Sequence, residues 1–266
     1  LRQAADDRRM LAFWPDIVRP LLEELSPNHI VEIGSESGKT TKLLLDFAAE
    51  IQATVHAIDP APLFDPVAVR QAYGSGFVFY PERSLSALES IDQIDVALID
   101  GDHNWYTVFH ELQLIEKRCV ANDRPLPLIL LHDVAWPYGR RDLYYDPTNI
   151  PDEFRQPWDN KGISPTESSL LDAGGLNPHL CHAVEEGGPR NGVLTAVEDY
   201  LKETDVPFVA ARIPAVFGLG ILLPGPLARA KPEIRRRVEI WTTPEVESFI
   251  DRLEMARIAM LTGERS

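Results

Sequence analysis

The run HIVEIGSESGKT, residues 29–40, decides the fold class of this chain. Its apolar first half ends at Gly34, and this pattern predicts a buried strand that breaks into a glycine turn and then a helix. Such a turn lies at the carboxyl edge of a parallel sheet, where open α/β proteins bind ligands. Gly34 and Gly38 would let the backbone approach a nucleotide or a cofactor closely.

The same run argues against a phosphate ligand. A phosphate-binding loop needs four residues between its first glycine and Gly-Lys-Thr, whereas three residues separate Gly34 from Gly38. Glu36 also places a carboxylate where backbone N–H groups would cradle a phosphate. S-adenosylmethionine is cationic, carries no phosphate and tolerates nearby acids such as Glu32 and Glu36. We therefore expect a cationic cofactor at this turn.

Apolar runs alternate with helical patterns along the chain, which predicts a mainly parallel sheet with helices on both faces. Asp59 follows the second apolar run, where an acid accepts hydrogen bonds from ribose hydroxyls or simply caps a turn. Two further strands, joined by a tight turn that contains proline, are expected near the end of the chain. The expected strands are 29–33, 54–58, 76–80, 95–99, 127–131, 206–213 and 216–223, with helices at 39–51, 105–118 and 232–262.

Three segments resemble the class I S-adenosylmethionine-dependent methyltransferases: VEIGS at 31–35, AID at 57–59 and DVALIDGDHNWY at 95–106. The last is similar to metal-dependent small-molecule O-methyltransferases of the macrolide-sugar and antibiotic-sugar type, and to cephalosporin hydroxylase-like proteins. The resemblance covers residues 28–135. It implies an α/β, Rossmann-like, mainly parallel seven-stranded sheet with helices on both faces and an antiparallel strand in a C-terminal hairpin. The family's Gly-x-Gly-x-Gly is reduced here to Gly34 and Gly38.

The resemblance also implies which residues bind S-adenosylmethionine. They belong to the glycine turn, to the start of the helix after it, and to the ends of the later strands. The predicted cofactor-binding residues are Glu32, Gly34, Ser35, Gly38, Thr40, Asp59, Ser84 and Asp100.

Acids and histidines follow the fourth and fifth predicted strands. Asp100, His132 and Asp133 can meet in one cleft, and crowded carboxylates of this kind are relieved by a divalent cation. By resemblance, Asp100 and Asp133 would hold magnesium. An imidazole from His132 would suit manganese, iron or zinc better, or would have a structural role.

The stretch between the fourth strand and the following helix carries the predicted catalytic residues. By resemblance, Asp102 is the expected general base, with His103 as an alternative base or as a residue that shapes the site. Asp-Gly-Asp-His could also be a turn with helix-capping acids.

The segment 134–190 is too long and too irregular to be an ordinary connection between two elements, so we expect it to be an insertion. Its aromatic residues favour a packed lid over the active site, the alternative being a partly disordered surface segment. An arginine pair and neighbouring aromatic residues just beyond the metal motif, Tyr145 among them, could clamp a sugar ring or an acidic aromatic group, or could anchor the lid through neighbouring aspartates. These predicted substrate-binding residues are Trp136, Arg140, Arg141 and Tyr144.

Composition narrows the function further. The formal net charge of -15 argues against a protein that tracks a nucleic-acid backbone. No apolar run approaches the ~20 residues that span a bilayer, and the N-terminus lacks a signal-peptide pattern. Two cysteines are too few for a disulfide scaffold, so a cytoplasmic location is the expectation.

We expect one methyltransferase-like domain over 1–266, and the C-terminal helical part could support a homo-oligomer. Its parts are an N-terminal helical segment (1–27), a cofactor-binding core (28–133), the insertion or lid (134–190), a final helix and β-hairpin (191–224) and a helical extension (225–266).

The resulting hypothesis is a divalent-metal-assisted O-methyltransferase that uses S-adenosylmethionine and acts on a small hydroxylated metabolite, such as a sugar, a glycosylated natural product or a catechol-like ring. Magnesium is the expected metal, with manganese or iron as alternatives. The competing hypotheses are a metal-independent methyltransferase, a metal-dependent hydroxylase-like enzyme, a noncatalytic cofactor-binding subunit and a nucleotide-hydrolysing phosphate-loop protein.

Overall fold

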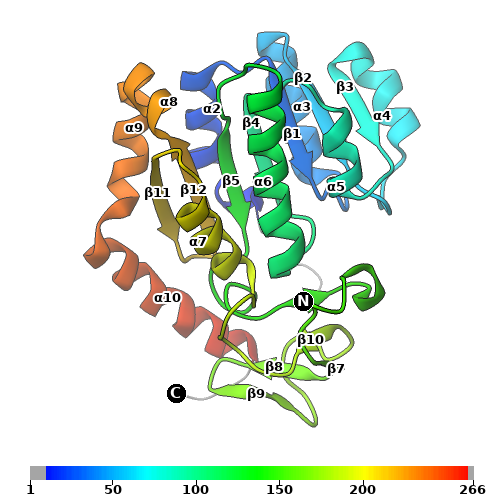
Figure 1. Ribbon diagram of the computed structural model, residues 1–266, viewed down its shortest axis with the longest axis vertical. Coiled ribbons are helices and arrows are strands. Elements are labelled where there is room, and N and C mark those ends of the chain that lie inside the picture. Colours follow the sequence, from blue (N-terminus) through cyan, green and yellow to red (C-terminus); the bar gives the residue numbers. More distant parts are fainter. Residues whose placement is uncertain (1–9, 263–266) are drawn as a thin grey trace.

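The computed structural model describes residues 10–262. The N-terminal helical segment predicted for 1–27 therefore lies partly outside the described residues. Within them, a seven-stranded sheet has the order β3-β2-β1-β4-β5-β12-β11 (Figure 1). Its strands are β1 (His29–Ile33), β2 (Thr54–Ile58), β3 (Phe77–Tyr80), β4 (Val96–Ile99), β5 (Leu128–His132), β11 (Phe208–Ile213) and β12 (Leu219–Pro224).

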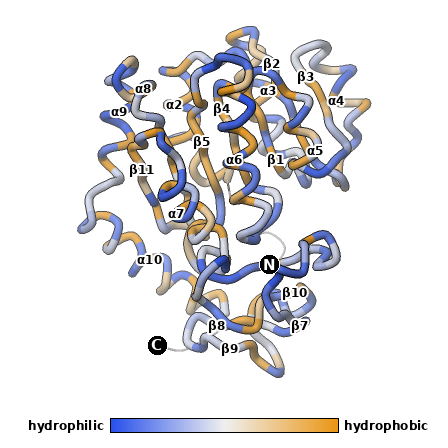
Figure 2. Tube along the Cα trace, viewed as in Figure 1, coloured by the Kyte–Doolittle hydropathy of each residue, from blue (hydrophilic) through white to orange (hydrophobic). Residues whose placement is uncertain are grey.

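The sheet is parallel from β3 to β5, and β12 runs antiparallel between β5 and β11. The central strands are buried on both faces, as parallel strands between two helix layers must be. Figure 2 shows hydrophobic residues concentrated along these strands. The predicted mainly parallel seven-stranded sheet with an antiparallel C-terminal hairpin strand is confirmed.

Helices cover both faces of the sheet and bury two apolar cores. One face carries η1 (Met10–Ala12), η2 (Trp14–Val18), α2 (Arg19–Leu25), α3 (Lys39–Ile51), α8 (Gly225–Ala230) and α9 (Pro232–Glu239). The other carries α5 (Ser84–Ala87), η4 (Leu88–Ser90), α6 (Trp105–Ala121) and α7 (Val193–Glu203). The remaining helices are α4 (Pro66–Tyr73), η3 (Gly74–Gly76), η6 (Ile240–Thr242) and α10 (Pro244–Thr262).

The hairpin and the last helix differ in detail from the sequence prediction. A strand was expected from 216, but Val216 and Phe217 have positive φ angles and belong to the turn, so β12 begins at Leu219. The helix expected over 232–262 is divided by η6 into α9 and α10. No helix within 10–262 combines the length and apolar character needed to cross a bilayer.

The insertion is ordered and lies beyond the carboxyl ends of the parallel strands (Figure 1). It contains one three-stranded sheet, β6-β10-β7, and one hairpin, β8-β9. Its elements are β6 (Leu143–Tyr144), η5 (Pro147–Asn149), β7 (Trp158–Asn160), β8 (Gly162–Ser164), β9 (Glu167–Leu171) and β10 (Cys181–Ala183). A small apolar core that includes Tyr138, Leu143 and Ile163 holds it together.

Candidate functional site

A cavity of about 430 Å³ lies where the parallel strands end and the insertion begins. Three groups of residues line it. The strand ends contribute Ile33, Gly34, Ser35, Glu36, Ile58, Asp59, Asp100, Gly101, Asp102 and His103, the N-terminal segment contributes Met10 and Leu11, and the insertion contributes Tyr144, Tyr145, Asp146, Asn149 and Ile150.

The glycine turn has the position predicted for it, and Gly34 borders the cavity. Its φ is +87°, and a Cβ atom there would lie 2.2 Å from the backbone oxygen of Asp100. The close approach of β1 and β4 therefore already requires a glycine here, and the predicted approach of a ligand stays a prediction. Gly38, at φ +75°, precedes α3 and faces the ring of Phe64.

Asp59 fixes the shape of the turn. One of its carboxylate oxygens accepts the backbone N–H groups of Ser35 at 3.0 Å and Glu36 at 2.7 Å, and the other accepts that of Ala61 at 2.8 Å. Asp59 also borders the cavity, and Oδ1, which accepts one hydrogen bond, has a second lone pair. The predicted contact with a ribose stays a prediction.

Glu32 lies behind the turn, buried beneath it. Its carboxylate accepts hydrogen bonds from the hydroxyl groups of Thr41 at 2.6 Å and Ser35 at 3.2 Å. Burial raises the pKa of Glu32 to about 8. Of the eight residues predicted to bind the cofactor, six border the cavity, whereas Glu32 and Gly38 do not; the six are Gly34, Ser35, Thr40, Asp59, Ser84 and Asp100.

Two acids and two histidines form a second cluster at the ends of β4 and β5. Nδ1 of His103 lies 3.1 Å from the Asp133 carboxylate, and Nδ1 of His132 lies 3.0 Å from Asp133 and 3.4 Å from Asp100. Both histidines and Asp133 are buried, while Asp100 is partly exposed to the cavity. The predicted metal ligands lie close together, but of Asp100, His132 and Asp133 only Asp100 borders the cavity.

The structure changes which histidine could hold a metal. Nδ1 of His132 faces carboxylates and Nε2 lies 3.0 Å from the carbonyl of Val216, so both ring nitrogens meet acceptors and must carry protons. Burial lowers the pKa of His132, but Asp100 and Asp133 outweigh burial and raise it to about 10. The group with ligand atoms within 4.8 Å of one another is Asp100, His103 and Asp133, so His103 replaces His132.

His103 is held on three sides. Asp133, whose own backbone has φ +60°, contacts Nδ1, and the ring of Tyr138 stacks on the imidazole at 5.5 Å. The hydroxyl of Tyr145 lies 3.1 Å from Nε2. A carboxylate at Nδ1 favours the tautomer with its proton on that nitrogen, which leaves Nε2 as a proton acceptor.

Asp102 borders the cavity, and its role as the general base stays a prediction. Its carboxylate accepts a hydrogen bond from the Thr107 hydroxyl at 3.2 Å, and Asn104 caps the start of α6 beside it. Burial raises the pKa of Asp102. Asp102 therefore also contacts the first turn of α6, in line with the alternative prediction that Asp-Gly-Asp-His is a turn before a helix.

Three of the four residues predicted to bind substrate are engaged inside the insertion and are not among the described residues that line the cavity. Arg141 is 1% exposed, donates to three backbone carbonyls and lies 3.5 Å from Glu186. Arg140 forms a two-pronged ion pair with Glu198 on α7, and Trp136 packs on the insertion core. The acceptors of Arg141 are the carbonyls of Ser168, Ala183 and Val184.

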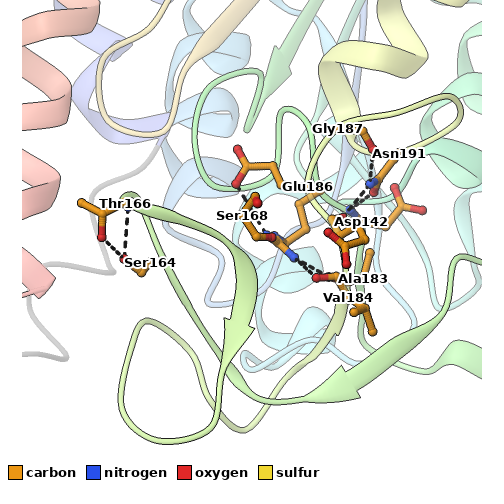
Figure 3. Close-up of polar contacts among 11 residues, drawn as sticks. Asp142, Ser164, Thr166, Ser168, Ala183, Val184, Glu186, Gly187 and Asn191 are labelled. Atoms are coloured by element: carbon orange, nitrogen blue, oxygen red, sulfur yellow. Dashed lines mark hydrogen bonds and ion pairs between the residues drawn. The ribbon is translucent and has the colours of Figure 1, made fainter.

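Asp142 anchors the insertion to the starts of α6 and α7, two helices that cover one face of the main sheet. Its buried carboxylate accepts the backbone N–H groups of Trp105 at 2.7 Å and Gly192 at 2.6 Å, which precede or begin α6 and α7. Asn191 accepts the N–H of Asp142 and donates to the carbonyl of Gly187 (Figure 3). Sequence reasoning weighed Asp142 only as a partner for the arginines, and nothing in the sequence marks it as a backbone anchor.

Tyr144 does reach the cavity, together with its neighbour Tyr145. Tyr144 is buried and donates its hydroxyl to Asp142 at 2.7 Å, whereas the ring of Tyr145 is 56% exposed. Sequence reasoning placed Tyr145 among the aromatic residues near the predicted clamp, but it did not include Met10 or Leu11, and no sequence signal marks these two residues.

Comparisons with known proteins agree with this description. Residues 31–134 match the model of a family described as a methyltransferase domain, and no curated protein matches the chain. A Burkholderia thailandensis 1,6-didemethyltoxoflavin-N1-methyltransferase structure with bound S-adenosylhomocysteine is 17% identical, with 84% of this chain and 85% of that chain covered and a TM-score of 0.44.

Two further solved structures show a similar level of likeness. The S-adenosylhomocysteine-bound methyltransferase PaMTH1 of Podospora anserina is 14% identical, covers 84% of this chain and 85% of its own, and has a TM-score of 0.45. Human N-acetylserotonin methyltransferase, in complex with S-adenosylmethionine, is 14% identical and has a TM-score of 0.44. The match covers 84% of this chain and 55% of the human chain. Residues 31–134 thus match a methyltransferase domain, and the sheet order is that of a Rossmann-like methyltransferase fold.

Proposed function

We propose that this chain is an S-adenosylmethionine-dependent O-methyltransferase that acts on a hydroxyl group of a small molecule. The observation that carries the proposal is His103, which borders the cavity with Nδ1 at the Asp133 carboxylate and Nε2 at a hydroxyl group. In a methyltransferase, an imidazole held in this way is suited to take the proton of an oxygen nucleophile.

The cavity suits the cofactor electrostatically. Five carboxylates border it, those of Glu36, Asp59, Asp100, Asp102 and Asp146, against the two cationic side chains of Lys39 and Arg83. This excess of negative charge favours a sulfonium and an ammonium over a phosphate. When bound, S-adenosylmethionine supplies an electrophilic methyl group. The glycine turn, fixed by Asp59, would hold it against the ends of β1 and β4.

The roles of the chain's own residues follow from the geometry. His103 Nε2 would accept the proton of the substrate hydroxyl, and Asp133 would stabilise the imidazolium that results. Tyr138, stacked on the imidazole, and the wall of the insertion would limit access of water to the reacting oxygen.

The residues also fit a divalent cation. Asp100, His103 and Asp133 offer two carboxylates and one imidazole within 4.8 Å of one another, a donor set suited to manganese or iron as well as to magnesium. A cation there would lower the pKa of a coordinated hydroxyl and orient it. A His103 nitrogen that coordinates a cation cannot also accept the substrate's proton, so the metal-assisted and metal-independent forms of the proposal give His103 different roles.

Calorimetry with S-adenosylhomocysteine, followed by methyl transfer from labelled S-adenosylmethionine to a panel of small phenols and alcohols, tests the proposal. We expect His103→Gln to bind S-adenosylhomocysteine and to lose about 10²–10⁴-fold in turnover. His179→Gln, on the exposed surface, is the matched control. Activity that survives a chelator supports the metal-independent form, and cofactor binding without transfer to any member of the panel contradicts the enzyme assignment.

A further inference from the structure

The last helix, α10, buries a charged side chain and exposes apolar ones. It runs along one edge of the molecule, from η6 toward the insertion (Figure 1). On its inner side, the buried carboxylate of Glu254 accepts the backbone N–H of Phe217 at 2.9 Å and pairs with Arg257 at 2.6 Å. Glu247 pairs with Arg212 of β11 at 2.6 Å. Ion pairs and hydrogen bonds therefore hold α10 to the fold alongside apolar packing.

The outer side of α10 carries a line of apolar residues. Phe249, Leu253 and Met260 are 55%, 56% and 78% exposed, and Ala256 is exposed as well. Their spacing of four, three and four residues places them in one line along the helix. A surface helix ordinarily turns such a line toward the core. We call these four residues the α10 stripe, which no described part of the chain covers.

The exposed apolar area of α10 is large enough for the centre of a dimer interface. Leu261, at the end of the helix, is 47% exposed. A large apolar side chain has roughly 150–200 Å² of surface, so Leu261 and the three large residues of the α10 stripe expose roughly 400 Å² per copy. Two copies would bury roughly 800 Å² of apolar surface, and homodimer interfaces are about 65% apolar. The whole interface would then be roughly 1,200 Å², which lies at the lower end of the range for specific, stable association.

We propose that the α10 stripe binds the α10 stripe of a second copy of this chain, with the two helices antiparallel about a two-fold axis. The stripe is complementary to itself in this arrangement. With the axis between Leu253 and Ala256, Leu253 would face the partner subunit's Ala256, and Phe249 would face the partner subunit's Met260. A large side chain then meets a small one near the axis, and a thioether meets an aromatic ring further out.

The charges beside the stripe favour antiparallel over parallel helices. Arg252 and Arg257 lie on opposite sides of the stripe, five residues apart. Residues with this spacing face each other across a parallel pair, so two arginines would meet there twice. Like charges that face each other weaken association. In the antiparallel pair, Arg257 would instead lie beside the partner subunit's Ile250.

Two other occupants of the stripe fit less well. A helix that lies on a membrane has lysines and arginines on its polar side, whereas the inner side of α10 carries Glu247 and Glu254. A chain with a formal net charge of -15 is also repelled by an anionic bilayer. The residues of this sequence outside 10–262 contain one large apolar side chain, Leu1, and would cover little of the stripe.

Sedimentation velocity of the full chain, from about 1 to 100 µM, tests the proposal without any variant. We expect the mass to rise from that of a monomer to that of a dimer as the concentration increases. Leu253→Glu keeps a good helix former and should weaken association by more than about 100-fold, because the two-fold axis places the new charge in the interface twice. Val120→Glu puts the same charge at an exposed apolar position of α6 and should dimerise like the wild type.

A mixture of two variants tests the antiparallel arrangement. Leu253→Glu on one copy would face Ala256→Lys on the other, while the second Leu253–Ala256 contact stays native. We expect the equimolar mixture to associate at least about tenfold more tightly than either variant alone. A mixture that associates no more tightly than the separate variants overturns this arrangement.

Three further results would overturn the inference: a wild type that stays monomeric at about 100 µM, a dimer that survives Leu253→Glu, and a monomer that floats with phosphatidylcholine vesicles. Circular dichroism of each variant reports its folding. If Leu253→Glu does not fold, Met260→Glu, near the end of α10, takes its place. Sedimentation does not require a bound cofactor, so the dimer and the proposed methyl transfer can fail separately.

Discussion

Glu111 should make the stability of this protein depend on pH. It lies on α6 and is fully buried. Burial raises its pKa from 4.5 to about 8; the Ser84 side chain opposes this rise, and the Asp102 carboxylate adds to it. At about 1.36 kcal/mol per pKa unit, this difference corresponds to about 5 kcal/mol.

The sign follows from the folded-state pKa being the higher one. The folded state binds the proton of Glu111 more tightly than the unfolded state does. The contribution of Glu111 to the free energy of unfolding is therefore most favourable below pH 4.5 and falls as the pH rises. Above pH 8 it has fallen by the full amount, about 5 kcal/mol. Glutamine at position 111 is neutral at every pH and nearly the same size. We therefore expect Glu111→Gln to gain stability relative to the wild type as the pH rises, by about 4 kcal/mol between about pH 5 and pH 9.

Urea unfolding followed by circular dichroism at three pH values measures this difference. Asp123→Asn, at an exposed turn, removes one negative charge without removing a buried one and should change the free energy of unfolding by less than about 0.5 kcal/mol. Parallel curves for Glu111→Gln and the wild type across this range would refute the reasoning, because the carboxyl would then have the same proton affinity in both states.

Three further predictions concern the site. Gly34→Ala should abolish binding of S-adenosylhomocysteine in calorimetry, since its Cβ would overlap a strand backbone; Gly74→Ala, also at positive φ but with open space around it, should retain binding. Arg141→Ala should lower the free energy of unfolding by more than about 3 kcal/mol in urea melts, because it leaves buried carbonyls unpaired. Arg140→Ala removes a half-exposed ion pair and should cost less than about 1 kcal/mol with turnover unchanged.

The main sheet was predictable because its signals are local. β1 and β2 have the predicted bounds, and β3, β4 and β5 differ by one residue at their ends. β1, β2, β4 and β5 are apolar runs that end next to a glycine or an acid, and β3 ends next to Pro81. Strands buried on both faces leave such runs in the sequence. The ordered insertion was predicted only as a packed segment, because its strands are short. β7, Trp158–Asn160, is exposed throughout and has no hydrophobic period.

The site was predictable as a place but not as a set of contacts. Parallel strands bring their carboxyl ends together, so acids that follow them must meet. Contacts across the insertion could not be inferred in this way, because Arg141 and Asp142 bind backbone groups that no side-chain pattern marks. The charge of Arg141 and its position in the sequence suggested a substrate clamp. In the structure, Arg141 and Asp142 are both buried and hold backbone groups of the insertion in place.

The candidate metal group contains His103 instead of the predicted His132, and the backbone conformation of Asp133 explains this difference. Alternate residues of β5 face opposite cores, and His132, the last of them, faces the core that contains Phe13, whose ring lies 6.2 Å away. Asp133 has φ +60°, a conformation that aspartate tolerates better than most residues, and its carboxylate contacts both histidines. One carboxylate thus joins a histidine that is committed to the fold with a histidine that borders the cavity, and only the second can exchange a proton with a substrate.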